Sequence, residues 1–367
     1  MSNNKCLTST IIDYSCEIKN HHHVIIEMTG YNAKPFVDVL VKAIQEVGAS
    51  VSVLNKSETV LNEFLMQSDG DNIKSLAHQE LTKLKQTDVY IMVKSLECTD
   101  GLMEVPQETI AFYNEHYIKP IHAYVLNQTR WLSIRYPNKE MAENAHMSLE
   151  AFTDYYYKVC TIDYSELSKA MDVLVEMMSK TKKVHIKGRG TDVEFSIENL
   201  PVHKCDGLIN LPDGEVYTAP IKTSVNGFVT YNVASRYKGR DFETVKLTFK
   251  EGKIVDFEGT NKEALSEIFN TDEGAKYIGE FALGVNPYLT TPIKDILFDE
   301  KISGSFHLTP GFAYANANNG NASAIHWDLV CIQTPAYGGG EIYFDNMLIR
   351  QNGDFVDDRL KILNPIK

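Results

Sequence analysis

The sequence predicts a mixed α/β and α+β protein, with a doubly wound parallel sheet in the N-terminal half and a β-rich C-terminal half. Before residue 130, short apolar runs alternate with stretches of helical periodicity, which is typical of strand–helix–strand units. After residue 181, strand-like runs follow one another between turn residues, with little helix among them. We therefore expect two domains, residues 1–180 and 181–367, a number that also suits a chain of 367 residues.

The helices and strands of the first half are predicted from the periodicity of apolar residues and from capping residues. Apolar runs predict strands at 23–28, 50–54 and 88–93, and a further run at 120–125 takes the place of the next strand. Helical spacing predicts helices at 36–47, 72–85 and 105–115. A longer helical stretch covers 148–180, with Ser148 as a capping residue at its start.

The second half reads as a series of short strands. Apolar and β-branched runs predict strands at 184–186, 193–197, 228–231, 244–249, 254–257, 342–344 and 347–349. The pairs Asp345-Asn346 and Asn352-Gly353 are hairpin turn signals between the last of these strands. One helix is expected near 262–269.

Charge and composition exclude several classes of partner. With 36 basic and 49 acidic residues the net charge is -13, which argues against nucleic acid and anionic membranes as partners. No stretch approaches 18 consecutive apolar residues, so no transmembrane helix is expected. The N-terminus lacks the pattern of a secretory signal, and the six cysteines form no C-x-x-C pair. We expect a soluble, cytoplasmic protein with reduced thiols.

Four stretches carry the chemistry, because each places a carboxylate or an imidazole in an apolar or glycine-rich setting. They lie at 211–216, 279–287, 299–307 and 323–328. Charged groups are rarely buried in such settings unless they are paired or hold a metal. His326 and Asp328 are two residues apart, so on a strand their side chains would project from one face. The residues alone leave two readings open: a metal site, or separate loop and surface residues.

Several blocks of residues carry a specific resemblance: 130–137, 141–142, 147–156, 163–164, 187–192, 212–220, 279–283, 298–300 and 323–328, together with His307 and Tyr314. In this order they resemble the aminopeptidase T and aminopeptidase S family of two-metal metallopeptidases. The resemblance covers roughly residues 125–355, while the N-terminal half is similar only in its βα pattern.

This resemblance implies an aminopeptidase that hydrolyses the N-terminal peptide bond of peptides with a free N-terminus, through a water bridged by two metal ions. The residues that fall on the family's metal-ligand positions are Glu215, Glu280, Glu300, His307, His326 and Asp328. With no thiolate among them, the two divalent ions could be Zn, Co, Mn or Mg. The resemblance also implies a homodimer.

Catalytic roles follow from the same resemblance. Glu215 or Glu280 bridges the ions or takes the proton, and Tyr314 donates a hydrogen bond to the developing oxyanion. The sequence departs from the family in two intervals. Glu300 and His307 lie about two residues further apart than usual, which leaves the role of Glu300 open, and the connection from Tyr314 to His326 is short and rich in Asn and Ala.

Two other readings remain. The fold also resembles that of dihydroxypyridine ring-cleaving dioxygenases, which hold a single Fe(II) with two histidines and one carboxylate. In those relatives the position of Glu280 carries a histidine and the position of Glu215 is not acidic, so the two glutamates favour the two-metal reading. A metal-free binding protein on the same scaffold is the third reading, and an acidic cluster without a cation would repel itself.

Overall fold

The computed structural model describes residues 3–56, 58–95 and 105–366. The chain forms two compact units. The first comprises Met1–Thr161 with Gly207–Leu211, and the second comprises Ile162–Asp206 with Pro212–Lys367. The two domains expected at residues 1–180 and 181–367 stay a prediction. In the described residues, no helix is both long and apolar enough to cross a membrane.

A five-stranded parallel sheet forms the centre of the first unit, as the alternating pattern predicts. Its strand order is β2-β1-β3-β4-β8, and every neighbouring pair is parallel. The strands are β1 (His23–Thr29), β2 (Ser50–Asn55), β3 (Val89–Lys94), β4 (Arg130–Arg135) and β8 (Asn210–Leu211). Shortly after β8 come Asp213 and Glu215, two acidic residues of the candidate site described below.

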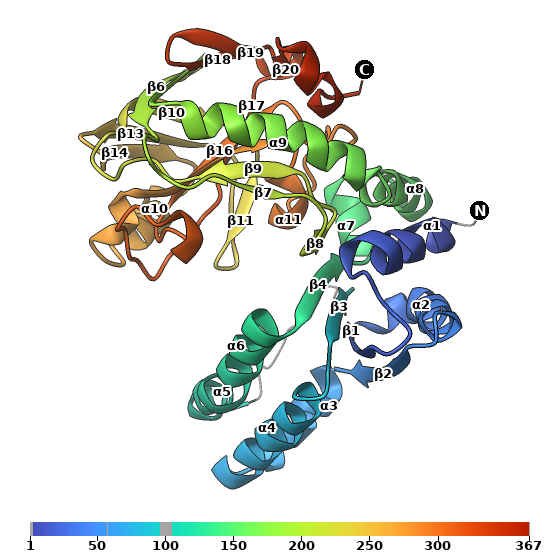
Figure 1. Ribbon diagram of the computed structural model, residues 1–367. Coiled ribbons are helices and arrows are strands. Elements are labelled where there is room, and N and C mark those ends of the chain that lie inside the picture. The colour runs from blue at the N-terminus through green and yellow to red at the C-terminus, as the bar shows by residue number, and fades with distance from the viewer. Residues whose placement is uncertain (1–2, 57, 96–104, 367) are drawn as a thin grey trace. The chain divides into compact units, whose positions relative to one another are not determined.

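Helices cover both faces of this sheet, with α4, α5 and α6 on one side and α1 and α2 on the other (Figure 1). Tyr90 and Met92 of β3 share a buried cluster with Ile73 of α4, Tyr113 of α5 and Ile121 of α6. The doubly wound prediction is therefore confirmed. The helices of this unit are α1 (Asn3–Ser9), α2 (Lys34–Glu46), α3 (Glu58–Gln67), α4 (Gly70–Leu84), α5 (Gln107–Tyr113), α6 (Lys119–Gln128), α7 (Lys139–Asn144) and α8 (Leu149–Cys160).

Two expectations for the first half were wrong in detail. The run at 120–125 belongs to helix α6 and not to a strand: Pro120 lies in the first turn of the helix, where proline is tolerated, and Ile121 and Val125, four residues apart, are both buried. The stretch at 148–180 is two helices, α8 and α9 (Tyr164–Lys180), with a break after Cys160. Ser148 caps α8 by accepting a hydrogen bond from the backbone N–H of Ala151 at 3.2 Å, as expected.

Two antiparallel sheets make up most of the second unit, which confirms its β-rich character. The larger sheet has the order β14-β13-β10-β6-β5-β18-β19-β20. Its strands are β5 (Lys183–Gly188), β6 (Thr191–Ser196), β10 (Asn226–Tyr231), β13 (Val245–Lys250), β14 (Lys253–Gly259), β18 (Gly340–Phe344), β19 (Met347–Gln351) and β20 (Asp354–Phe355). The expected turn between β18 and β19 is present, with positive φ angles at Asp345 and Asn346.

The smaller sheet, of order β17-β16-β15-β9-β7, holds the chemistry. Its strands are β7 (His203–Cys205), β9 (Glu215–Thr218), β15 (Ile278–Gly284), β16 (Ser305–Pro310) and β17 (Val330–Ile332). A separate hairpin joins β11 (Ser235–Tyr237) and β12 (Arg240–Phe242), and the remaining helices are α10 (Lys262–Phe269), at the residues expected, and the short α11 (Ile296–Asp299).

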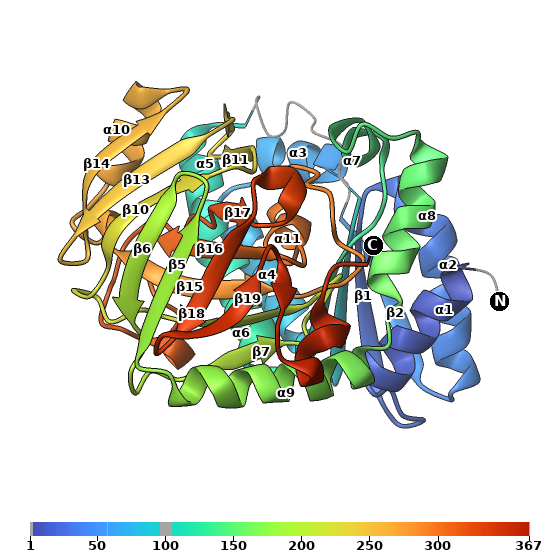
Figure 2. The same cartoon turned by 90° about the horizontal axis from the view of Figure 1, so that it is seen from above.

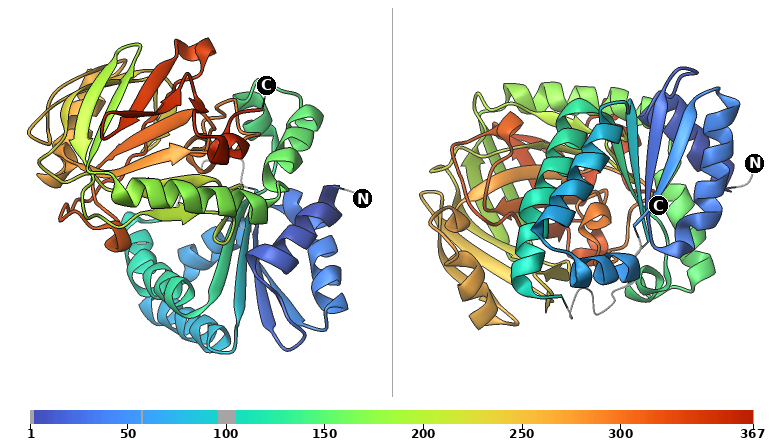
Figure 3. Two further views of the ribbon diagram at one scale, coloured as in Figure 1. Left: turned by 45° about the horizontal axis from the view of Figure 1, so that its top comes forward. Right: turned by 90° about the horizontal axis from the view of Figure 1, so that it is seen from below.

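The two sheets of this unit pack face to face, which leaves the central strands without contact to solvent. Figure 2 and the left view of Figure 3 show β5, β6 and β18 lying over β15 and β16. Phe195 of β6 meets Phe281 of β15 with ring centroids 4.9 Å apart, and the Tyr231 hydroxyl donates to the Leu308 carbonyl at 3.2 Å. Every residue of β15 and β16 is buried.

Gly284, at the end of β15, allows the segment after α11 to cross close to the sheet. A Cβ atom at Gly284 would lie 2.3 Å from the carbonyl oxygen of Ile302 and 2.9 Å from that of Glu300. Atoms do not approach so closely, so only glycine lets residues 300–302 lie where they do.

We predict that Gly284→Ala destabilises the protein by about 1–3 kcal/mol, because the added methyl group must displace backbone atoms. Urea unfolding followed by circular dichroism measures the loss. Gly188→Ala in β5 is the control, since its nearest neighbour would be 3.2 Å away, and its loss should be smaller. Equal losses for the two variants would contradict this account of Gly284.

Candidate metal centre

Strand register brings three of the expected residues to one face of the smaller sheet. Glu215 of β9 is paired with Gly284 of β15, and His307 of β16 is paired with Ala282 of β15. Paired residues point to the same side of a sheet, and so do residues two apart on one strand. One face of β15 carries Glu280, Ala282 and Gly284. The side chains of Glu215 and His307 therefore lie on the same face of the sheet as that of Glu280.

His326 and Asp328 reach the same place from an extended segment. They do not lie on a strand: His326 forms an isolated bridge with Gly311, and residues 327–329 are not in a strand. The backbone is nonetheless extended enough for the two side chains to converge. Trp327, between them, is buried against the rings of Tyr237 and Phe242, at centroid distances of 4.9 and 4.8 Å.

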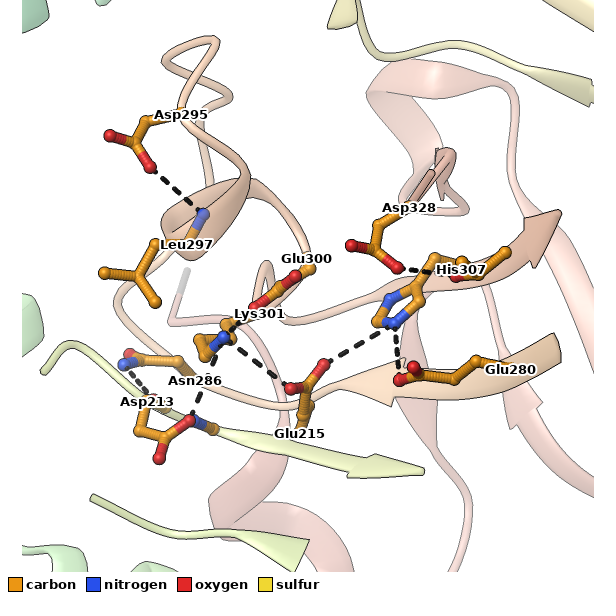
Figure 4. A network of polar contacts seen from close by, with 12 residues as sticks. Asp213, Glu215, Glu280, Asn286, Asp295, Leu297, Glu300, Lys301, His307 and Asp328 are labelled. Atoms are coloured by element: carbon orange, nitrogen blue, oxygen red, sulfur yellow. Dashed lines mark hydrogen bonds and ion pairs between the residues drawn. The ribbon is translucent and has the colours of Figure 1, made fainter. Parts of the chain in front are cut away.

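The five residues form two groups of three that share Glu280. The first ligand group is Glu215, Glu280 and His307, and the second is Glu280, His326 and Asp328; in each, one ligand atom per residue lies within 4.8 Å of the others. Figure 4 shows the first group, with His307 Nε2 3.4 Å from Glu280 Oε1 and 3.5 Å from Glu215 Oε2. In the second group, His326 Nε2 lies 3.3 Å from both Glu280 Oε2 and Asp328 Oδ1.

Hydrogen bonding shows that these atoms fit a cation. Glu215 Oε2, Glu280 Oε2 and His326 Nε2 are buried and have no hydrogen-bond partner among the described residues. The Nδ1 atom of His326 lies 2.9 Å from the Phe312 carbonyl, which can only accept, so Nδ1 carries the proton. Nε2 is therefore the nitrogen left to bind a metal ion, and a cation between it and the two facing carboxylate oxygens would satisfy all three atoms.

The electrostatics of the site favour positive charge. Burial lowers the pKa of His326, but Asp328 and Glu280 outweigh it and raise that pKa to about 11. Burial likewise opposes the charge of His307, while Glu280 and Glu215 raise its pKa to about 9. Carboxylates thus dominate the potential at both imidazoles.

Tyr314 stands at the edge of the second ligand group. Its ring centroid is 4.7 Å from that of His326 and 5.7 Å from that of Phe312, and the residue is 42% exposed. Burial of the hydroxyl and the nearby carboxylates, Glu280 first, raise its pKa well above the usual value. The hydroxyl therefore keeps its proton and can donate a hydrogen bond.

Glu300 belongs to neither ligand group; it lies beside Lys301 and is bonded to its ammonium (Figure 4). Sequence reasoning missed Lys301, whose ammonium is also 3.6 Å from Glu215 Oε1 and 3.9 Å from Asp213 Oδ1. A lysine next to two carboxylates in the sequence gives no sign of burial, and only the fold shows that it is buried.

Cys205 also approaches Asp213 and Glu215, and burial raises the pKa of its thiol, so it stays protonated.

Fold and site together define a metallopeptidase-like protein with a carboxylate and imidazole centre in an antiparallel sheet. The chain belongs to the thermophilic metalloprotease (M29) family, whose model matches residues 3–355. It is similar in structure to wild-type AmpT from Thermus thermophilus, with a TM-score of 0.76 and 19% sequence identity over 97% of this chain and 99% of the other. That likeness concerns the fold.

Curated relatives in sequence are named aminopeptidases. They include aminopeptidase AmpS of Bacillus subtilis (strain 168), 36% identical over 36% of this chain, and aminopeptidase PepS of Streptococcus thermophilus, 27% identical over 54%. The matched stretches span 35% and 52% of those two relatives, so the chain matches about a third to a half of their length. The family gives no support to the alternative of a ring-cleaving dioxygenase.

We predict that Thr309→Val weakens binding of a divalent ion about 10–100-fold, because the Thr309 hydroxyl donates to Asp328 Oδ1 at 2.6 Å and orients that carboxylate. Titration of chelator-treated protein with Mn²⁺ measures the affinity. Thr218→Val is the matched control: it removes a buried hydroxyl that donates to the Pro201 carbonyl, away from the site. Equal affinity in the two variants would contradict a role for Thr309.

Proposed function

We propose that this protein is a metal-dependent aminopeptidase that removes the N-terminal residue of peptides, using two divalent ions held by Glu215, Glu280, His307, His326 and Asp328. The observation that carries the proposal is that Glu280 belongs to both ligand groups. A carboxylate shared by two sets of ligands is the arrangement that a two-metal hydrolase requires. The names of the curated relatives support the substrate class.

Residues of the chain transfer the proton in the proposed reaction. Two divalent ions at these ligands would lower the pKa of a water molecule and polarise the scissile carbonyl. Glu215 or Glu280 accepts the proton that the water loses, and that proton passes to the leaving amine.

In this scheme Tyr314 donates a hydrogen bond to the oxyanion that forms from the scissile carbonyl. Its hydroxyl keeps its proton, and its ring packs against His326, at the edge of the second ligand group. A donor fixed beside the ligands stabilises negative charge that develops on the carbonyl oxygen.

The proposal includes a homodimer in the cytoplasm. The five cysteines in the described part of the chain, Cys6, Cys16, Cys160, Cys205 and Cys331, are all unpaired, which suits a reducing compartment. Cys98 lies outside the described residues. Light scattering after size-exclusion chromatography tests the dimer.

We predict that the purified protein binds about two divalent ions per chain and that stripping them abolishes release of the amine from a leucine anilide. Because both ligand groups use Glu280 and only one uses Glu215, Glu280→Gln should leave less than about one ion and Glu215→Gln about one. Elemental analysis paired with the hydrolysis assay measures both. Full metal content and full activity in both variants would overturn the proposed function.

We predict that Tyr314→Phe lowers kcat about 10²–10³-fold, the usual effect of removing one oxyanion donor, with metal content unchanged. Steady-state hydrolysis of the leucine anilide separates kcat from KM. Tyr288→Phe is a control, since Tyr288 is a comparably exposed tyrosine of the same unit, at 40%, and is outside both ligand groups. Unchanged kcat in Tyr314→Phe would remove the tyrosine from the scheme.

A further inference from the structure

A fully buried ammonium group lies beside the candidate metal centre. Lys301 is 0% exposed, and lysine is almost never buried so completely unless it is paired. Its Nζ atom donates to Glu300 Oε1 and lies 3.6 Å from Glu215 Oε1 and 3.9 Å from Asp213 Oδ1, as the dashed lines of Figure 4 show. Three carboxylates thus surround one cation.

The backbone fixes Lys301 in this position. Its N–H donates to the Phe298 carbonyl at 2.9 Å, and its carbonyl accepts from the N–H of Asn286 at 3.0 Å. Gly284 permits the close approach of the segment, as described above. The backbone of Lys301 is therefore held by the fold, and the buried side chain places its ammonium beside Glu300 and Glu215.

Glu215 divides its two oxygens between two cations. Oε1 faces Lys301, whereas Oε2 faces His307 Nε2, at 3.5 Å, in the first ligand group. Glu300 is already bonded to the same ammonium. The second ligand group is oriented by neutral groups instead, because the Thr309 hydroxyl donates to Asp328 and the Phe312 carbonyl accepts from His326.

We propose that Lys301 is a positioning residue that withholds Glu300 from the metal centre, so that the first ligand group binds its ion more weakly than the second. The inference rests on the proposed two-metal function. An ammonium that satisfies Glu300 and one oxygen of Glu215 leaves the first ion with three protein ligands and a positive neighbour. The ion of the first ligand group is then the one that exchanges.

A double-mutant cycle tests this in the full chain. Wild type, Lys301→Met, Glu300→Gln and the Glu300→Gln/Lys301→Met double variant are stripped with chelator and titrated with Mn²⁺ by calorimetry. We expect two binding steps in the wild type, separated by at least about tenfold in affinity. Lys301→Met should tighten the weaker step at least about tenfold by releasing Glu300 as a ligand, and in the Glu300→Gln background the same change should tighten it less than about threefold.

Several outcomes would overturn the inference. Equal affinities at the two wild-type steps would do so, even if Lys301→Met failed to fold. Equal tightening in both backgrounds would show that Lys301 only repels the ion and does not withhold Glu300. Circular dichroism confirms that each variant is folded. A wild type that binds no Mn²⁺ would be a failure of the proposed function, which separates the two results.

Discussion

The burial of several carboxylates at the centre of an antiparallel sheet is the constraint on which the rest of the second unit depends. Glu215 and Glu280 are 7% and 4% exposed, and they lie on one face with His307. Removing carboxylates from water is costly unless positive charge compensates them. The site meets this need with two imidazoles, one lysine and a place for metal ions. A sheet with apolar residues at these positions would be simpler to fold, so their presence points to function.

Rigid support for the ligands comes from both the strands and the packing behind them. Register alone sets the relative positions of Glu215, Glu280 and His307, because paired residues on neighbouring strands cannot slide without losing the ladder. The segment with His326 and Asp328 has no such ladder and relies on Trp327, packed between aromatic rings, with its indole N–H donating to the Ser235 hydroxyl at 3.0 Å. The two ligand groups are thus held by different means.

Much of this architecture could be predicted from the sequence, for reasons that differ between elements. Strands β1 and β3 are nearly continuous apolar runs, so they were found almost to the residue, whereas α6 was taken for a strand because its short apolar stretch fits either element. The candidate ligands were assigned from the resemblance to the aminopeptidase family, because the residues alone left a metal site as only one of two interpretations. Whether Glu300 faces the metal centre depends on how residues 300–307 cross the sheet, and no local pattern encodes that path.

Lys301 shows the limit of sequence reasoning most clearly. In the sequence it follows Asp299 and Glu300, where a lysine is typical of a solvated, charge-balanced surface. In the fold it is completely buried, because Gly284 leaves room for its backbone and three carboxylates stabilise its charge. Its side chain shares Glu215 with the first ligand group. A substitution of Lys301 would therefore change the net charge beside the metal centre while all five candidate ligands stay in place. The affinity of the centre for metal ions thus depends on this lysine as well as on the ligands themselves.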